Sequence, residues 1–135
     1  MSNLLALSQV AVDITIPSDQ DWIEGLGNND PNTGAPIALD GIALTMFVRP
    51  ALDDPLVLFT ASTAAGTIQI LPATQGSSVN SVWAVVVYMV ADASGRRRLP
   101  AGLVPGSYVY GLQAYDGTVT RTIASGALII TQGVP

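Results

Sequence analysis

The side chains in this sequence that could do chemistry are carboxylates and arginines. Ten acidic residues, nine of them Asp, accompany five basic residues, and the chain contains no Lys, His or Cys. Without His or Cys it lacks the usual groups of nucleophilic catalysis and the usual ligands of zinc, haem and iron–sulfur clusters. Catalysis would therefore depend on paired carboxylates or on a divalent cation held by oxygen atoms.

The densest acidic stretch lies near the N-terminus and contains Asp19, Asp21, Glu24 and Asp30. Oxygen ligands could hold Ca²⁺ there, but no acid falls at the positions after Asp21 that an EF-hand loop would use. A solvated loop between strands explains the stretch better. Strand alternation also places no two carboxylates face to face, so we predict no catalytic residue, no cofactor and no metal site.

Arg96, Arg97 and Arg98 form the basic cluster of the sequence, directly after a predicted turn at Ser94–Gly95. Arginine binds phosphates and carboxylates bidentately, so the cluster could bind an anion, stay solvated or pair with acids of a neighbouring subunit. The net charge of −5 disfavours nucleic acid and anionic membranes as partners. We therefore expect a protein–protein contact at these arginines.

The elements that must position these residues are β-strands, because apolar residues recur mainly with a period of two. Predicted strands cover residues 10–16, 42–49, 55–60, 67–71, 79–91, 107–115, 118–124 and 127–131. About seven to nine short strands with frequent turns predict an all-β sandwich or barrel. We expect one domain over residues 1–135, with an N-terminal arm at 1–9 and a C-terminal tail at 132–135.

The segment from Val82 to Ala91 is apolar on both alternating faces. One face would carry Trp83, Val85, Val87 and Met89, and the other Val82, Val86, Tyr88 and Val90. In an isolated two-sheet fold the outer face of a strand meets water and should be polar. Either loops cover this outer face or another subunit does. The low charged fraction of 11% favours contact with other subunits.

Three local signals concern structure alone. Asp53–Asp54 before Pro55 predicts a turn in which an Asp side chain caps the backbone. Tyr108 follows a Pro-Gly turn at the start of a predicted strand, as in the tyrosine corner of immunoglobulin-like sandwiches, where the phenol hydroxyl bonds back to the loop. Gly126 interrupts the alternation and predicts a bulge or a bend between the last two strands.

Several of these segments together resemble a known group of proteins. They are Val12–Ile16, Ala38–Leu44, Phe47–Pro50, Leu103–Leu112, Asp116–Gly117, Thr120–Arg121 and Ser125–Ile130. Their order and turns are similar to the small immunoglobulin-like domain of tailed-phage baseplate and tail proteins, such as the N-terminal domain of lactococcal-phage baseplate upper proteins. The resemblance spans about residues 10 to 131, and residues 60–81 depart from it.

The resemblance implies an immunoglobulin-like antiparallel β-sandwich in a virion structural protein without enzymatic activity, made in the bacterial host cytoplasm. Repeated copies would pack in a tail, baseplate or fibre-attachment assembly, against one another and against neighbouring virion proteins. Apolar strand faces and edges would make these contacts, and the arginines and the acidic 19–30 stretch would fix their register. The residues expected at contacts are Trp22, Val86, Tyr88, Val90, Arg96, Arg97 and Arg98.

Two alternatives stay open at this point. The chain could be a capsid decoration or head-fibre protein, since immunoglobulin-like domains serve there too. It could instead be a carbohydrate-binding module that attaches the particle to a host glycan. That function would need exposed aromatic side chains, and Trp22, Tyr110 and Tyr115 are the candidates.

Overall fold

The computed structural model describes residues 10–18, 20–27, 38–51, 53–72, 80–91, 93–100 and 103–132. Every helix or strand in these ranges is a β-strand, which confirms the all-β prediction. In chain order the strands of the described residues are β1 (Val10–Ala11), β2 (Ile14–Pro17), β3 (Trp22–Gly27), β4 (Ala43–Arg49), β5 (Phe59–Ser62), β6 (Ile68–Pro72), β7 (Asn80–Val87), β8 (Val90–Ala91), β9 (Arg97–Arg98), β10 (Gly106–Tyr115) and β11 (Thr120–Thr131). The expected arm at 1–9 lies outside the described residues, as do residues 133–135 of the expected tail.

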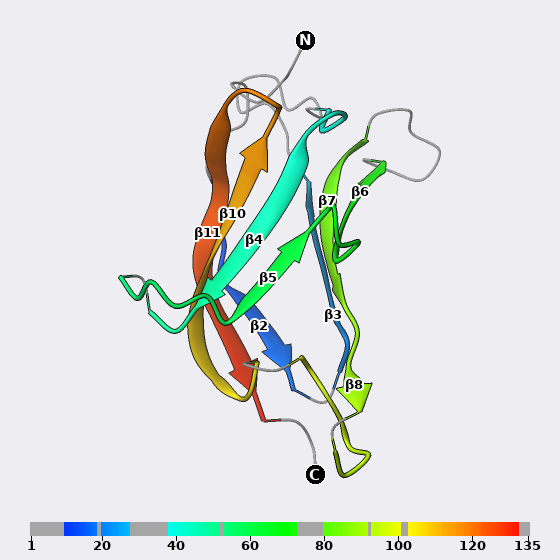
Figure 1. The fold of residues 1–135 in the computed structure, drawn as a ribbon, viewed down its shortest axis with the longest axis vertical. Helices are drawn as coiled ribbons and strands as arrows, with labels where there is room; N and C mark the ends of the chain where they lie inside the picture. The colour runs from blue at the N-terminus through cyan, green and yellow to red at the C-terminus, as the bar shows by residue number, and fades with distance from the viewer. Residues whose placement is uncertain are drawn as a thin grey trace.

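The strands form two larger sheets and a small hairpin. The largest sheet has the order β1-β11-β10-β4-β5, and β2 also pairs with β11. Its pairs are antiparallel except that β1 and β2 run parallel to β11. The second sheet has the antiparallel order β3-β7-β6. The β8–β9 hairpin lies at the end of the molecule opposite the β10–β11 turn (Figure 1).

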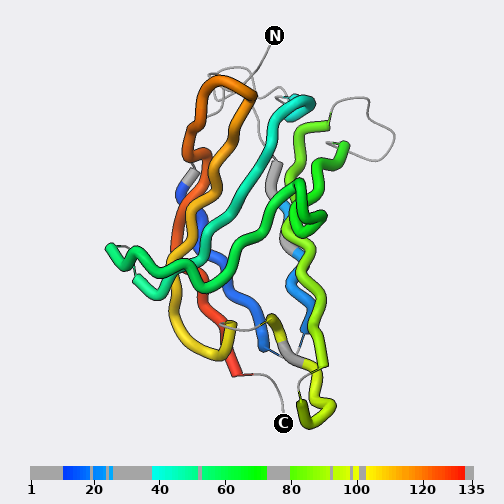
Figure 2. The backbone as a smooth tube through the Cα atoms, in the orientation of Figure 1, coloured from blue at the N-terminus to red at the C-terminus, as the bar shows by residue number. Residues whose placement is uncertain are grey.

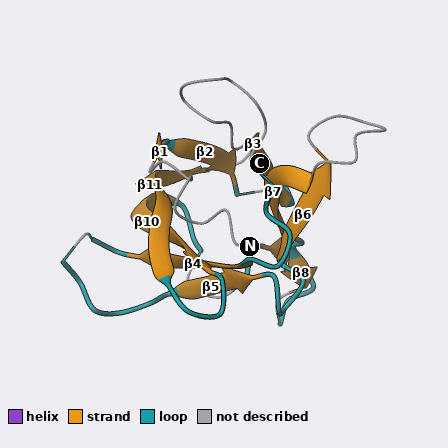
Figure 3. Ribbon diagram, turned by 90° about the horizontal axis from the view of Figure 1, so that it is seen from above, coloured by secondary structure: helices purple, strands orange, loops and turns teal. Residues whose placement is uncertain are grey.

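Both larger sheets contribute their inner side chains to one core, and Figure 3 shows them on either side of it. The strand β4 alternates between buried and less buried residues, as a strand with one face on a core should. The largest fully buried side chains include Leu44, Met46, Leu112 and Leu128 from one sheet and Trp22, Ile68 and Trp83 from the other. Burial of each such side chain contributes about 1.5–3 kcal/mol to folding.

The observed strands differ from the predicted ones in several places. Of the predicted strand 55–60, only Phe59 and the residue after it belong to β5. Pro55 has no amide hydrogen, and the Leu56 amide donates to Asp54 Oδ1 (2.9 Å) instead of to a strand. The Asp54 cap that the sequence predicts is therefore confirmed, and pairing begins only where the Leu58 amide donates to the Val48 carbonyl (2.8 Å).

Another difference is the strand β3, which lies where the acidic stretch of the sequence predicts a solvated loop. That prediction is wrong for residues 22–27, which pair with β7 from Trp22↔Val87 to Gly27↔Val82. Two glycines, at 25 and 27, hide the alternation that would identify a strand. Asp19 and residues 28–30 lie outside the described residues.

The strand β11 passes through Gly126 without a break, so the predicted interruption there is also wrong. The bulge lies at Ile123, because Leu112 pairs with Ala124 while Gln113 pairs with Thr122. Gly126 has a different role. A Cβ at this position would collide with the carbonyl oxygen of Val12, so only glycine admits the neighbouring chain segment.

That neighbouring segment is the break between β1 and β2, which follow one edge of β11 (Figure 2). We call it the Val12–Asp13 seam. The Val12 amide donates to the Ser125 carbonyl (2.9 Å), and the Tyr110 hydroxyl donates to the Val12 carbonyl (2.5 Å). The Ala127 amide donates to Asp13 Oδ1 (3.0 Å). The seam therefore fastens the N-terminal strands to the largest sheet.

The predicted bond of the tyrosine near the start of β10 is confirmed. The Tyr108 hydroxyl donates to the Val104 carbonyl oxygen at 2.6 Å. The ring is 8% exposed and belongs to the core. This bond ties the loop before β10 to the strand that follows it.

Candidate protein-contact surface

Trp22 is not a surface residue. Its side chain is 0% exposed and belongs to the core, so its predicted role at a contact is wrong. The reason is register: Trp22 pairs with Val87, and both side chains lie in the core. Its indole Nε1 and that of Trp83 are buried without a hydrogen-bond partner among the described residues, which costs the fold free energy because a buried indole N–H normally donates to an acceptor.

The predicted role of Val86 at a contact needs correction as well. It has the outward parity that the sequence predicts, yet it is only 9% exposed. Its neighbours on the two flanking segments are Ile23, which pairs with it, and Thr67, whose carbonyl accepts its amide at 2.8 Å. A valine between two such neighbours is shielded within its own sheet. The exposed residue of this pair is Ile23, at 61%.

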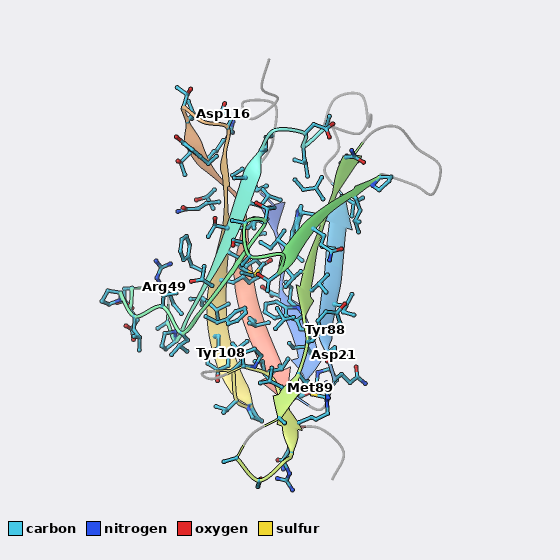
Figure 4. The ribbon with its side chains drawn as sticks, turned by 45° about the vertical axis from the view of Figure 1, so that its right-hand side comes forward. Asp21, Arg49, Tyr88, Met89, Tyr108 and Asp116 are labelled. Atoms are coloured by element: carbon cyan, nitrogen blue, oxygen red, sulfur yellow. The ribbon has the colours of Figure 1, made fainter. Side chains whose placement is uncertain are left out.

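Tyr88 and Val90 are exposed, by 61% and 53%. They follow the outward-facing residues of β7 in the same alternation, beyond the end of that strand. The inner parity is as predicted, since Trp83, Val85 and Val87 are core residues and Met89 packs against the core. The Met89 amide donates to Asp21 Oδ1 (2.7 Å), which fixes the chain where Tyr88 faces solvent (Figure 4).

The arginine cluster lies on the β8–β9 hairpin that follows. The hairpin pairs Val90 with Arg98 and Ala91 with Arg97, and its turn contains Gly95 with a φ of 84°. Only glycine adopts this φ readily, which explains the predicted turn at Ser94–Gly95.

The three arginines differ in their surroundings. Arg97 donates from its guanidinium to the Met89 carbonyl (3.1 Å) and is exposed, as is Arg96. Arg98 belongs to β9, and its side chain lies outside the described part of the chain.

We call the exposed residues of this hairpin and of the neighbouring ends of β3 and β7 the hairpin face. It consists of the exposed residues Ile23, Tyr88, Val90, Arg96 and Arg97. Tyr and Arg are the residues that most often dominate protein–protein contacts, and the adjacent aliphatic side chains supply apolar area. Sequence reasoning missed Ile23, because recognising it requires the strand β3 and its register with β7.

A second exposed surface lies between β4 and β5, and we call its residues Asp53, Asp54 and Leu56 the acidic loop. Asp53 is exposed and Asp54 partly exposed, and Leu56 is 56% exposed. Because Asp54 binds the Leu56 amide, the leucine is held in a turn outside the sheet. Close by, the Arg49 guanidinium lies over the Phe47 ring, 5.5 Å from its centroid.

The described residues offer little else to a ligand. They contain no group of three or more Asp, Glu, His or Cys side chains that could hold a metal ion. The Asp21 carboxylate of the acidic stretch binds a backbone amide. No helix suited in length and hydropathy to cross a membrane occurs among these residues.

The aromatic residues suggested for glycan binding are mostly internal. Trp22 is fully buried and Tyr110 is 4% exposed, whereas Tyr115 is 47% exposed. Tyr110 uses its hydroxyl inside the fold, at the Val12–Asp13 seam. Of these three candidates only Tyr115 lies at the surface, so together they do not make the flat aromatic surface that a carbohydrate-binding module would need.

Comparison of the chain with models of protein families, with curated proteins and with solved structures found no match.

Proposed function

We propose that the chain is a non-enzymatic structural subunit of a bacteriophage particle, in a tail, baseplate or fibre-attachment assembly, and that it acts through protein–protein contacts. The observation that carries the proposal is the hairpin face. There the fold leaves Ile23, Tyr88 and Val90 more than half exposed beside exposed arginines. Adjacent apolar and cationic side chains of this kind suit a protein partner.

The proposed fold is an immunoglobulin-like β-sandwich. The order β3-β7-β6 corresponds to strands B-E-D of that fold, and β11-β10-β4-β5 corresponds to G-F-C-C′. The bond from Tyr108 to Val104 further supports the assignment, because it has the geometry of a tyrosine corner. Antibody domains have a disulfide between strands B and F and a tryptophan on strand C. This chain has no Cys, and its tryptophans lie on β3 and β7.

The link to a phage particle rests on the resemblance of the strand-and-turn segments between about residues 10 and 131 to phage baseplate and tail domains. A capsid decoration or head-fibre protein would use the same surfaces, so the place in the particle is a matter for experiment. Burial of two of the three candidate aromatic residues weighs against the glycan-binding alternative.

Mass spectrometry of purified particles from the host that carries the gene tests the proposal. We expect the chain in the particles in many copies, and electron microscopy with a tagged chain should locate it on the tail or on the head. A chain that occurs only in the cell lysate, and never in purified particles, would overturn the proposal. A hydrolase screen of the purified chain should give no activity.

A further inference from the structure

We propose that the hairpin face of one copy binds the acidic loop of a second copy. This inference rests on the proposed function, because it names the partner surface through which a structural subunit would repeat. Both surfaces are exposed in the single chain, and one carries neighbouring arginines where the other carries neighbouring aspartates.

Charge distinguishes the two surfaces. The chain has a net charge of −5, and three of its five arginines lie in the β8–β9 hairpin region. A partner for this hairpin should therefore carry carboxylates. Five aspartates among the described residues each accept a hydrogen bond from their own chain: Asp13, Asp21, Asp40, Asp54 and Asp116. Asp53 is exposed at the tip of the acidic loop, beside Asp54.

Apolar side chains accompany the charges on both surfaces. Leu56 is 56% exposed next to the two aspartates, and Tyr88 and Val90 are 61% and 53% exposed next to the arginines. An isolated exposed leucine needs no explanation. Here, however, the charges beside the leucine are negative and the charges beside the tyrosine and the valine are positive. Contact between the surfaces would bury the leucine against the tyrosine and valine while the charges pair at the rim.

The positions of the two surfaces determine the kind of assembly. The acidic loop projects from one side of the molecule, and the hairpin lies at its lower end toward the opposite side (Figures 1 and 3). A contact between different patches of identical chains is heterologous, so each bound copy still offers its own free loop and free hairpin face. Such contacts generate a ring if the rotation closes and an open helical row if it does not.

The contact is expected to be weak for a single pair of chains. Two patches of a few side chains bury less than the roughly 1,200 Å² of a standard interface. We expect a Kd of about 0.1 mM, which repetition in an assembly would strengthen by multivalency. High salt should weaken the contact further, because its charge pairs are exposed.

Sedimentation velocity of the full chain, up to about 1 mM, tests the inference, because a Kd of this size leaves much of the chain associated at that concentration. Arg96→Asp and Asp53→Arg should each weaken self-association about tenfold, since each places like charges opposite one another. A mixture of the two variants should associate as the wild type does, because every contact between unlike chains again joins opposite charges. Neither substitution removes a contact of the core.

Leu56→Ser should also weaken self-association, and Val119→Ser provides its matched control. Val119 is 42% exposed at the β10–β11 turn, remote from both surfaces, so its removal should leave self-association unchanged. A wild-type chain that stays monomeric over the whole range overturns the inference. A dimer formed through two hairpin faces also overturns the inference. It would be recognised because Asp53→Arg would leave self-association intact, and because mixing the two variants would not restore the self-association that Arg96→Asp removes.

These outcomes are distinct from failure of the proposed function. A monomeric chain that is nevertheless abundant in particles would refute this contact and leave the structural role standing. A chain that self-associates as described but never occurs in particles would refute the structural role in a virion and leave the contact standing.

Discussion

The Val12–Asp13 seam and the hairpin face are built in opposite ways. At the seam the Val12 amide, the Val12 carbonyl and the Asp13 carboxylate each have a partner within the chain. At the hairpin face the largest apolar side chains, Ile23 and Tyr88, are each 61% exposed. The polar groups of the seam therefore find their hydrogen-bond partners within the chain, whereas the hairpin face leaves apolar area that only a partner could bury.

Because of this difference, the seam should determine the stability of the fold and the hairpin face its association with other chains. Removing the Tyr110 hydroxyl from the seam leaves the partly buried Val12 carbonyl without its donor, and that costs at least the net value of a hydrogen bond. Removing an exposed side chain of the hairpin face costs the fold little, because water already surrounds that side chain. Substitutions in the two regions should thus change different measurable quantities.

The largest effect is expected at Gly126. In Gly126→Ala the new Cβ meets the Val12 carbonyl, so β1 and β2 must shift away from β11 and their hydrogen bonds weaken. We expect the free energy of unfolding to fall by about 3 kcal/mol. Urea denaturation measures it, as a lower midpoint at an unchanged slope.

Gly111→Ala is the matched control, because Gly111 lies in the adjacent strand β10 and a Cβ there meets nothing within 4 Å. Alanine in that strand should leave stability unchanged or raise it by about 0.5 kcal/mol. Equal midpoints for the two variants would contradict the role of Gly126 as the site of close backbone approach.

A smaller loss is expected from Tyr110→Phe, which removes the hydroxyl bound to the Val12 carbonyl. We expect a loss of about 1–2 kcal/mol in the free energy of unfolding, the cost of a partly buried acceptor without its donor. In a Gly126→Ala background the loss should be smaller, because the seam is already displaced, and a double-mutant cycle measures the coupling. Tyr108→Phe removes a bond to Val104 instead, so its loss should simply add to that of Gly126→Ala. Additive behaviour of Tyr110→Phe as well would show that the hydroxyl does not act through the seam.

The interactions that could be predicted from the sequence are those between residues close together in the chain. The Asp54 cap and the Tyr108 hydroxyl bond join residues two and four positions apart, so their local spacing identifies them. The shared position of Val85 and Val87 on the inner face likewise follows from alternation within one strand.

The misassigned features depend on segments far apart in the sequence. Gly126 is required by Val12, whose carbonyl approaches it only because β1 pairs in parallel with β11. Burial of Trp22 depends on its register with Val87, and Val86 lies between Ile23 of β3 and Thr67. No local pattern contains this information. The hairpin face was therefore found only in part, without Ile23.

At the base of the hairpin face, Asp21→Ala removes the acceptor of the Met89 amide. We expect a local loss of about 1 kcal/mol, seen as faster hydrogen exchange of that amide rather than as a change in global stability. Asp21→Asn retains a side-chain oxygen that can accept the bond, so it should preserve most of the protection. Slow exchange in Asp21→Ala would mean that Asp21 does not fix the chain at Tyr88.

The smallest effect on stability, and a clear effect on association, is expected from Tyr88→Ser. Because the ring is 61% exposed, its loss should change the free energy of unfolding by no more than about 0.5 kcal/mol. The same substitution should weaken self-association, since it removes the largest apolar group of the hairpin face. Tyr115→Ser removes a tyrosine that is 47% exposed at the other end of the molecule, and it should change neither quantity. If Tyr88→Ser destabilised the chain as much as Tyr110→Phe does, Tyr88 would belong to the fold, and the contrast between the seam and the hairpin face would fail.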